Sequence, residues 1–306
     1  MLSSIVSLLA ATLRISPPIV LASIGGTYSE RTGIINIGLE GMILMGAFAG
    51  VVGSHFLGNP WLGVVCALIA GGALGFLHAV LCIRYKANQV VSGVGVNILA
   101  LGLTTFLLQV IWGNRGASDN VPGIKPLAIP VVKDIPVIGE IIGKQNPLVY
   151  VMLVIVVLAW VIMFRTPFGL KIRAVGEHPE AADTVGIHVH RIQYICVTLS
   201  GVLSGLGGAY LSLGWLNMFS QNMSAGRGFI ALAANIFGKW NPAGGFAAGL
   251  LFSFTDALQI KLQGWAIPNQ FIQMIPYILT ILILASAVKR AVPPAAIGKH
   301  YEKGEK

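Results

Sequence analysis

The sequence predicts an all-α protein, a polytopic transmembrane helical bundle of about eight or nine spans that includes broken helices. Only 10% of the 306 residues are charged, whereas soluble domains carry roughly 25%. The mean hydropathy is +0.80. Residues 148–164 and 271–288 carry no charged side chain at all, and each run approaches the ~20 residues that a bilayer requires. Together these features predict one transmembrane domain over residues 1–306.

Apolar runs separated by polar loops define the expected spans. Eight runs are long enough to cross a bilayer. The run 229–237 has nine residues, too few for ~30 Å of hydrocarbon at 1.5 Å per residue. We expect it to be a broken half-helix or to extend into the polar segment before it. The runs are 5–24, 34–57, 61–83, 90–112, 148–164, 192–216, 229–237, 244–260 and 271–288.

The basic residues predict an orientation in the membrane. The loops 84–89 and 165–191, the tail 289–306 and two further turns on the same side hold 13 of the 20 Lys and Arg residues. The positive-inside rule puts that side, with the basic C-terminal tail, in the cytoplasm of a bacterial-type plasma membrane. The N-terminus then lies outside. Topology therefore explains the net charge of +9 better than nucleic-acid binding does.

The longest loop on the opposite side covers residues 113–146 and is expected to be extracytoplasmic. It contains four prolines, which prevent a regular helix. An ordered cap and a flexible loop are both compatible with this composition. The prolines are Pro122, Pro126, Pro130 and Pro136.

Motifs for catalysis and metal binding do not occur in the sequence. Each Gly-Lys pair is followed by Gln145, Trp240 or His300, whereas a phosphate-binding P-loop requires Ser or Thr. No H-E-x-x-H, paired-cysteine or G-x-S-x-G pattern is present. We therefore expect no enzyme activity, metal or cofactor in this chain, and any energy for pumping must come from another subunit.

The loop 165–191 carries the signals of a short helix. Pro179 suits the first helical turn, the acids Glu180 and Asp183 flank Ala181 and Ala182 near the helix N-terminus, and Gly186 suits the C-terminal cap. A helix of about two turns is too short to be stable alone. It is expected to dock into a partner, although an ordinary surface connector fits the same pattern.

Three segments resemble one family of transport proteins. The loop with Glu180-Ala181-Ala182 and Gly186 looks like the coupling helix of ATP-binding-cassette (ABC) permeases. The stretches 30–42 and 226–242, with residues 169–176, are similar to the permeases shared by branched-chain amino acid, ribose and nucleoside importers. The amino-acid sequence of these segments is most like that of the nucleoside, or simple-sugar, branch.

This resemblance implies a division of labour. An extracytoplasmic solute-binding protein delivers the solute, and two permease subunits, usually different paralogous chains, form the path. Cytoplasmic ATP-binding subunits hold ATP and Mg and act on the coupling helices. In this chain the residues implied in that contact are Pro179, Glu180, Ala181, Ala182, Asp183 and Gly186.

Polar residues inside apolar runs are the candidates for the solute path, because such residues are costly in lipid. Asn36 and Glu40 are four apart and are expected on one helical face. Asn97 and Asn235 are two further candidates. For each of the four, a structural hydrogen bond between helices or a helix cap is the alternative.

Two rival functions remain open at this point. The same machine could carry a monosaccharide or a branched-chain amino acid instead of a nucleoside. Alternatively, the chain could act alone as an ion-coupled secondary transporter, which requires ionisable residues inside the membrane. Glu40 and Asp256 are the candidates for such an ion site.

Overall fold

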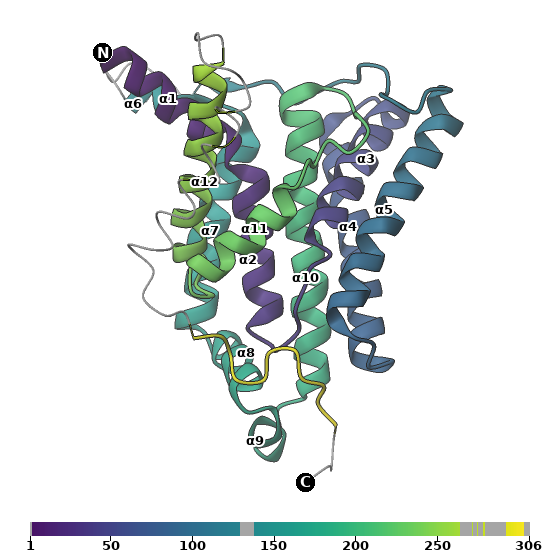
Figure 1. Ribbon diagram of the computed structural model, residues 1–306, viewed down its shortest axis with the longest axis vertical. Helices are drawn as coiled ribbons and strands as arrows, with labels where there is room; N and C mark the ends of the chain where they lie inside the picture. The colour runs from purple at the N-terminus through teal and green to yellow at the C-terminus, as the bar shows by residue number, and fades with distance from the viewer. Residues whose placement is uncertain are drawn as a thin grey trace.

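The computed structural model describes residues 2–128, 138–263, 271, 274, 278 and 292–302. In this part of the chain the architecture is a helical bundle with a single two-stranded ribbon, in which β1 (Leu127–Ala128) pairs antiparallel with β2 (Lys144–Gln145). Figure 1 shows long helices running roughly side by side. The N-terminus lies at one end, and the short helices α8 and α9 lie with the C-terminus at the other. We call the latter the α9 end.

Proline and asparagine mark where many helices begin. Asn59, Asn88, Asn146 and Asn241 each accept a backbone N–H of the helix that follows, which satisfies donors that the first turn leaves free. The helices are α1 (Leu2–Ile15), α2 (Pro17–Glu30), α3 (Leu39–Leu57), α4 (Pro60–Ala79), α5 (Gln89–Trp112), α6 (Ile138–Ile141), α7 (Pro147–Arg165), α8 (Pro167–Glu177), α9 (Pro179–Thr184), α10 (Val189–Ala209), α11 (Arg227–Phe237) and α12 (Pro242–Leu262), and two π-helical segments, η1 (Val80–Arg84) and η3 (Tyr210–Leu216), extend α4 and α10.

The expected number of eight or nine spans is higher than the number found. Six helices of the described chain are long and apolar enough to cross a membrane, and the bent pair α1–α2 would make a seventh. This pair bends by 48° at the break before Pro17. The run 229–237 forms α11, an 11-residue helix that is too short to span. The last run, 271–288, lies outside the described residues except for Phe271, Met274 and Ile278.

Helix α10 occupies the centre of the bundle, where it packs against α2, α3 and α4. Glycines allow this close approach. A methyl group added at Gly71 or Gly75 of α4, or at Gly201 or Gly205 of α10, would overlap backbone atoms of the facing helix. Small residues are a common means of packing helices in membranes, where no hydrophobic force drives them together.

The first part of the long loop 113–146 is an ordered cap on the end opposite to α9. Its backbone follows the segment after α10, with the N–H groups of Ser118, Val121 and Ile124 each donating to that segment at 2.8 Å. These bonds favour the ordered alternative for residues 114–124. Residues 129–137 lie outside the described part.

Candidate functional site

The loop 165–191 folds into α8 and α9 at the α9 end (Figure 1). Helix α9 has six residues and begins at Pro179. Gly186 follows it with a φ of +83°, a left-handed conformation that glycine adopts without strain. The N–H of Gly186 donates to Asp183 at 2.9 Å, and the N–H of Ile187 donates to Ala182 at 3.0 Å. The chain therefore turns back sharply after α9 toward α10.

Helix α9 has a packed side and an exposed side. Pro179 and Ala182 are buried, with Ala182 only 3% exposed. Glu180 and Ala181 are exposed, and Val185, directly after the helix, is 75% exposed. A short helix with a free, partly apolar side is a suitable contact surface for another protein.

The C-terminal segment (residues 292–302) crosses the α9 end and joins parts of the chain that are distant in sequence. The N–H of Ala296 donates to the carbonyl of Gly176 on α8, and the N–H of Gly298 donates to the carbonyl of Gly33, which follows α2; both distances are 2.9 Å. Figure 1 shows this segment beneath the ends of α8 and α2. Only residues 292–302 of the expected tail 289–306 are described.

Tyr301 connects this segment to α9. Its phenol shares a hydrogen bond with Asp183 of α9, and its ring centroid lies 5.3 Å from that of His190 on α10. Burial raises the pKa of Tyr301, and the hydrogen bond and the negative charges of Asp183 and Glu180 act in the same direction. Tyr301 is therefore protonated at neutral pH, and its phenol O–H donates a hydrogen bond to the Asp183 carboxylate.

Asn235 lies in a buried polar network that holds α11 against α2. Its Nδ2 donates to Glu30 Oε2 at 2.8 Å, and its Oδ1 accepts from Thr27 Oγ1 at 2.7 Å. Trp240 Nε1 donates to the same Glu30 oxygen at 2.5 Å. Asn235 is completely buried, and these contacts are structural.

Asn36 does not share a helical face with Glu40, so that expectation was wrong. Helix α3 begins only at Leu39, because residues 34–38 form a non-helical segment in which Asn36 Oδ1 accepts the N–H of Gly38 at 3.1 Å. Asn36 Nδ2 donates to Ser200 Oγ on α10 at 2.9 Å. The side chain is completely buried and links this segment to the central helix.

Glu40 fixes the start of α11. Its Oε1 accepts the N–H of Gly226 at 2.8 Å, and its Oε2 accepts the N–H of Gly228 at 2.7 Å. A carboxylate at a helix N-terminus satisfies free backbone donors and interacts favourably with the helix dipole. Both oxygens are thus engaged, which leaves Glu40 poorly suited to an ion site.

Asn97 of α5 lies on the same cavity as Glu40. Its Oδ1 accepts the N–H of Gly41 at 2.8 Å, and its Nδ2 donates to the carbonyl of Ile37 at 3.0 Å. The cavity has a volume of about 250 Å³. Its lining residues are Glu40, Gly41, Leu44, Asn97, Ile98, Leu101, Asn222, Gly226 and Phe229.

Two of the four candidate path residues are therefore brought together, and two are not. Glu40 and Asn97 share the cavity, whereas Asn36 and Asn235 are sealed in packing contacts elsewhere. Asn222 and Phe229 also line the cavity, but sequence reasoning did not select them. Asn222 lies in a polar turn that resembles any loop, and only its position before the short run 229–237 could have drawn attention to it.

Metal ligands do not gather within the residues that the structure describes, where no group of three or more His, Cys, Asp and Glu side chains is suitably placed. Asp256 of α12 is not a lining residue of the cavity that contains Glu40. The two ionisable residues considered for an ion site thus do not share that cavity.

Comparison with known proteins relates most of the chain to permeases. Residues 8–284 match the family model described as "Branched-chain amino acid transport system / permease component". The guanosine ABC transporter permease protein NupQ of Bacillus subtilis is 43% identical over 97% of this chain and 96% of its own length. The nucleoside ABC transporter permease protein NupC of Lactococcus lactis is 41% identical, with 97% of each chain covered.

A third relative has a different name. The putative glucose ABC transporter permease protein TsgC13 of Haloferax volcanii is 36% identical over 95% of this chain and 96% of its own. The family model covers far more than half of the sequence, and the bundle of long apolar helices agrees with it. This chain is an integral membrane protein that belongs to the family of branched-chain amino acid transport system permease components.

Proposed function

We propose that this chain is the membrane-spanning permease subunit of an ATP-driven importer of nucleosides. The observation that carries the proposal is the similarity to NupQ and NupC, at 43% and 41% identity over 97% of the chain. The similarity extends over nearly the whole length of all three chains and is not confined to one segment.

The α9 end is the proposed contact with a cytoplasmic ATP-binding subunit, which would hold ATP and Mg. Helix α9 offers the exposed Glu180 and Ala181 and is anchored through the buried Ala182. A force on α9 would reach α8 and α10 by chain connection, and the bond between Asp183 and Tyr301 would pass it to the C-terminal segment. This arrangement suits a helix that transmits movement. The α9 end, with the C-terminus, is then cytoplasmic.

The cavity at Glu40 and Asn97 is the proposed lining of the solute path. It combines the amide side chains of Asn97 and Asn222 with the ring of Phe229, groups that suit the hydroxyls and base edges of a nucleoside. Part of its wall is exposed apolar surface, with Ile98 67% and Phe229 50% exposed. A second, paralogous permease would complete the path, and an extracytoplasmic binding protein would deliver the solute.

A monosaccharide is the second candidate cargo. The 36% identity to TsgC13 favours it, because sugar hydroxyls could use the same amides. However, the identity to TsgC13 is lower than that to NupQ and NupC, and both of these relatives are named for nucleosides. These two facts favour nucleosides as the cargo.

The test is purification of the tagged chain from its native membranes in mild detergent, followed by uptake measurements on the recovered complex in liposomes. The proposal expects an ATP-binding subunit and a second permease in the preparation, and ATP-dependent uptake of radiolabelled nucleoside with the binding protein present. Uptake of glucose or leucine instead would contradict the assignment of nucleosides as the transported solute. Uptake by the chain alone on an ion gradient would overturn the mechanism.

A further inference from the structure

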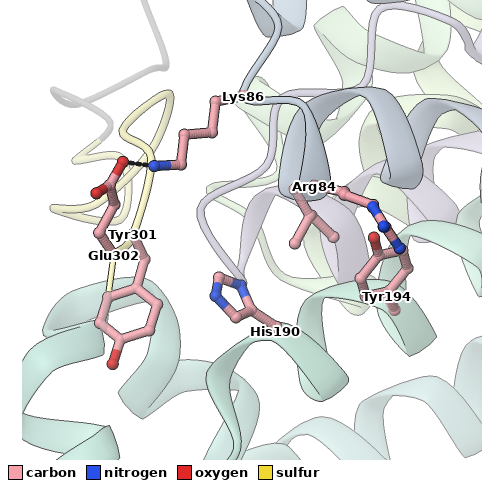
Figure 2. Close-up of a pocket in the computed structure, with 7 residues that line it drawn as sticks. Arg84, Lys86, His190, Tyr194, Tyr301 and Glu302 are labelled. Carbon is pink, nitrogen blue, oxygen red and sulfur yellow. Dashed lines mark ion pairs between the residues drawn. The ribbon is translucent and has the colours of Figure 1, made fainter. Parts of the chain in front are cut away.

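A basic cavity at the α9 end shares only Tyr301 with the proposed contact to the ATP-binding subunit. It lies where η1, the loop after it, the start of α10 and the C-terminal segment meet (Figure 2). Its volume is about 480 Å³, large enough for a small polar group. The lining residues are Ile83, Arg84, Lys86, His190, Tyr194, Tyr301 and Glu302.

The charge of this cavity is positive. Arg84 and Lys86 are cations at neutral pH, and Glu302 is the one carboxylate in the lining. Glu302 forms an ion pair with Lys86, as Figure 2 shows, while Arg84 has no carboxylate partner among the described residues. Because a guanidinium binds phosphate through two parallel hydrogen bonds, an Arg without a carboxylate partner favours a phosphate group as the ligand. Figure 2 shows Arg84 on the Tyr194 side of the cavity and Lys86 on the Glu302 side.

The position of the cavity indicates a ligand in the membrane interface. Arg84 is the last residue of the apolar span Pro60–Arg84. The ring of Tyr194 lies 5.9 Å from that of Phe76 on the same span, and Phe76 is 52% exposed. Val91, near the start of α5, is 69% exposed. The wall of the cavity thus continues into exposed apolar surface of a candidate membrane span, and tyrosine is enriched at the level of lipid headgroups.

We propose that this cavity binds the phosphate of an anionic phospholipid headgroup, with Arg84 as its direct partner and Lys86 as a second positive charge in the lining. The acyl chains would lie along the α4 surface that exposes Phe76. A soluble phosphate would use the same cations but would gain nothing from this apolar surface. Basic pockets beside transmembrane helices are known to recognise anionic headgroups. Lys86, which is paired with Glu302 of the C-terminal segment, would add positive charge to the cavity.

Spin-labelled phosphatidylglycerol and phosphatidylcholine test the proposal. Each lipid is mixed with the purified full-length chain in vesicles. Electron paramagnetic resonance then measures the fraction of the labelled lipid whose motion is restricted by contact with the protein. We expect a preference for phosphatidylglycerol in the wild type. Arg84→Gln and Lys86→Gln should each reduce that preference about fivefold, which corresponds to roughly 1 kcal/mol per basic side chain. Lys171→Gln, an exposed position on α8 outside the cavity, is the matched control and should leave it unchanged.

Each of the other outcomes overturns the proposal. If the wild type restricts both lipids equally, the cavity has no preference for phosphatidylglycerol. If Lys171→Gln loses as much of that preference as Arg84→Gln does, the preference does not come from this cavity. Displacement of the lipid by millimolar inorganic phosphate, with phosphate alone binding as tightly, would assign the cavity to a soluble anion. If the variants do not fold, photo-crosslinking of wild type with a headgroup-labelled phosphatidylglycerol replaces them, and absence of label from residues 83–86 and 190–194 contradicts the site. None of these readouts depends on transport.

Discussion

Asn235 on α11 donates a hydrogen bond of 2.8 Å to the carboxylate of Glu30 on α2, although the two residues are 205 positions apart. The bond is completely buried and fixes the short helix to a long one. Replacement of Asn235 by Leu would leave Glu30 with fewer donors. The Thr27 hydroxyl would keep only the Ser23 carbonyl as its acceptor. We expect a loss of about 1–3 kcal/mol in the free energy of unfolding, the typical cost of an unsatisfied buried polar group.

Denaturant unfolding of the purified chain, followed by tryptophan fluorescence, would measure this loss. Asn120→Leu is the control, because Asn120 is exposed, its backbone is outside the left-handed region, and its side chain makes no hydrogen bond within the described residues. A change below about 0.5 kcal/mol in Asn235→Leu, the range of ordinary surface substitutions, would show that the network does not stabilise α11.

The α4–α10 contact gives a second prediction. Gly201→Ala would place a methyl group against the backbone of Gly71 and Gly75. We expect a destabilisation of about 1–3 kcal/mol from overpacking, even though alanine is the better helix former. Gly102→Ala, a glycine in α5 with no atom within 4 Å of the added methyl, should be neutral or stabilising. Thermal unfolding of the two variants side by side checks the difference, and equal midpoints would contradict it.

Helix α9 gives a prediction on transport. Ala181 is exposed whereas Ala182 is buried, so a charge at Ala181 should disturb a partner without disturbing the fold. In the assembled complex we expect Ala181→Glu to reduce uptake at least tenfold while ATP hydrolysis continues, because one misplaced charge in an interface costs more than the 1.4 kcal/mol of a tenfold change. Ala181→Ser should transport normally. Wild-type uptake by Ala181→Glu would argue against the docking role.

The pH dependence of the C-terminal segment follows from Tyr301. Its pKa is raised in the folded chain, so the stability from its bond to Asp183 is complete below the unfolded value of about 10. That contribution is lost as the pH rises through the higher folded pKa. Tyr301→Phe should therefore be less stable than wild type by about 0.5 kcal/mol at pH 7.

Unfolding midpoints of both proteins between pH 7 and 11 test this expectation. The difference between wild type and Tyr301→Phe should shrink above about pH 10. A difference that stays constant over the whole range would mean that the phenol proton does not support the contact with Asp183.

Much of the fold could be predicted from the sequence, because hydrophobic length alone identifies a membrane helix. The runs 61–83 and 90–112 agree closely with α4 extended by η1 and with α5. The break between α1 and α2 escaped this method, since Pro17 and Pro18 sit within apolar residues and leave the hydropathy high. Local helical spacing also failed at Asn36, where the side chain accepts the backbone N–H of Gly38 and α3 begins only at Leu39.

The candidate site was less predictable, because its residues meet only through tertiary contacts. The pairing of Glu40 with Gly226 and Gly228 joins positions 186 and 188 residues apart. The contact of Gly298 with Gly33 is of the same kind. Neither leaves a local pattern in a single sequence, although the short run 229–237 did indicate that the chain is irregular near α11.

Two carboxylates bracket α11: Glu40 binds its first amides, and Glu30 binds Asn235 near its last turn. Only nine residues separate Glu30 from Glu40 along the chain, and the carbonyl of Gly33 within that stretch accepts a bond from the C-terminal segment. Helix α11 and the α2–α3 junction are therefore expected to move together as one unit, unless the hydrogen bonds of Glu30 and Glu40 break. A displacement of the C-terminal segment at Gly33 would then reposition Gly226 and Phe229 through the carboxylates of Glu30 and Glu40.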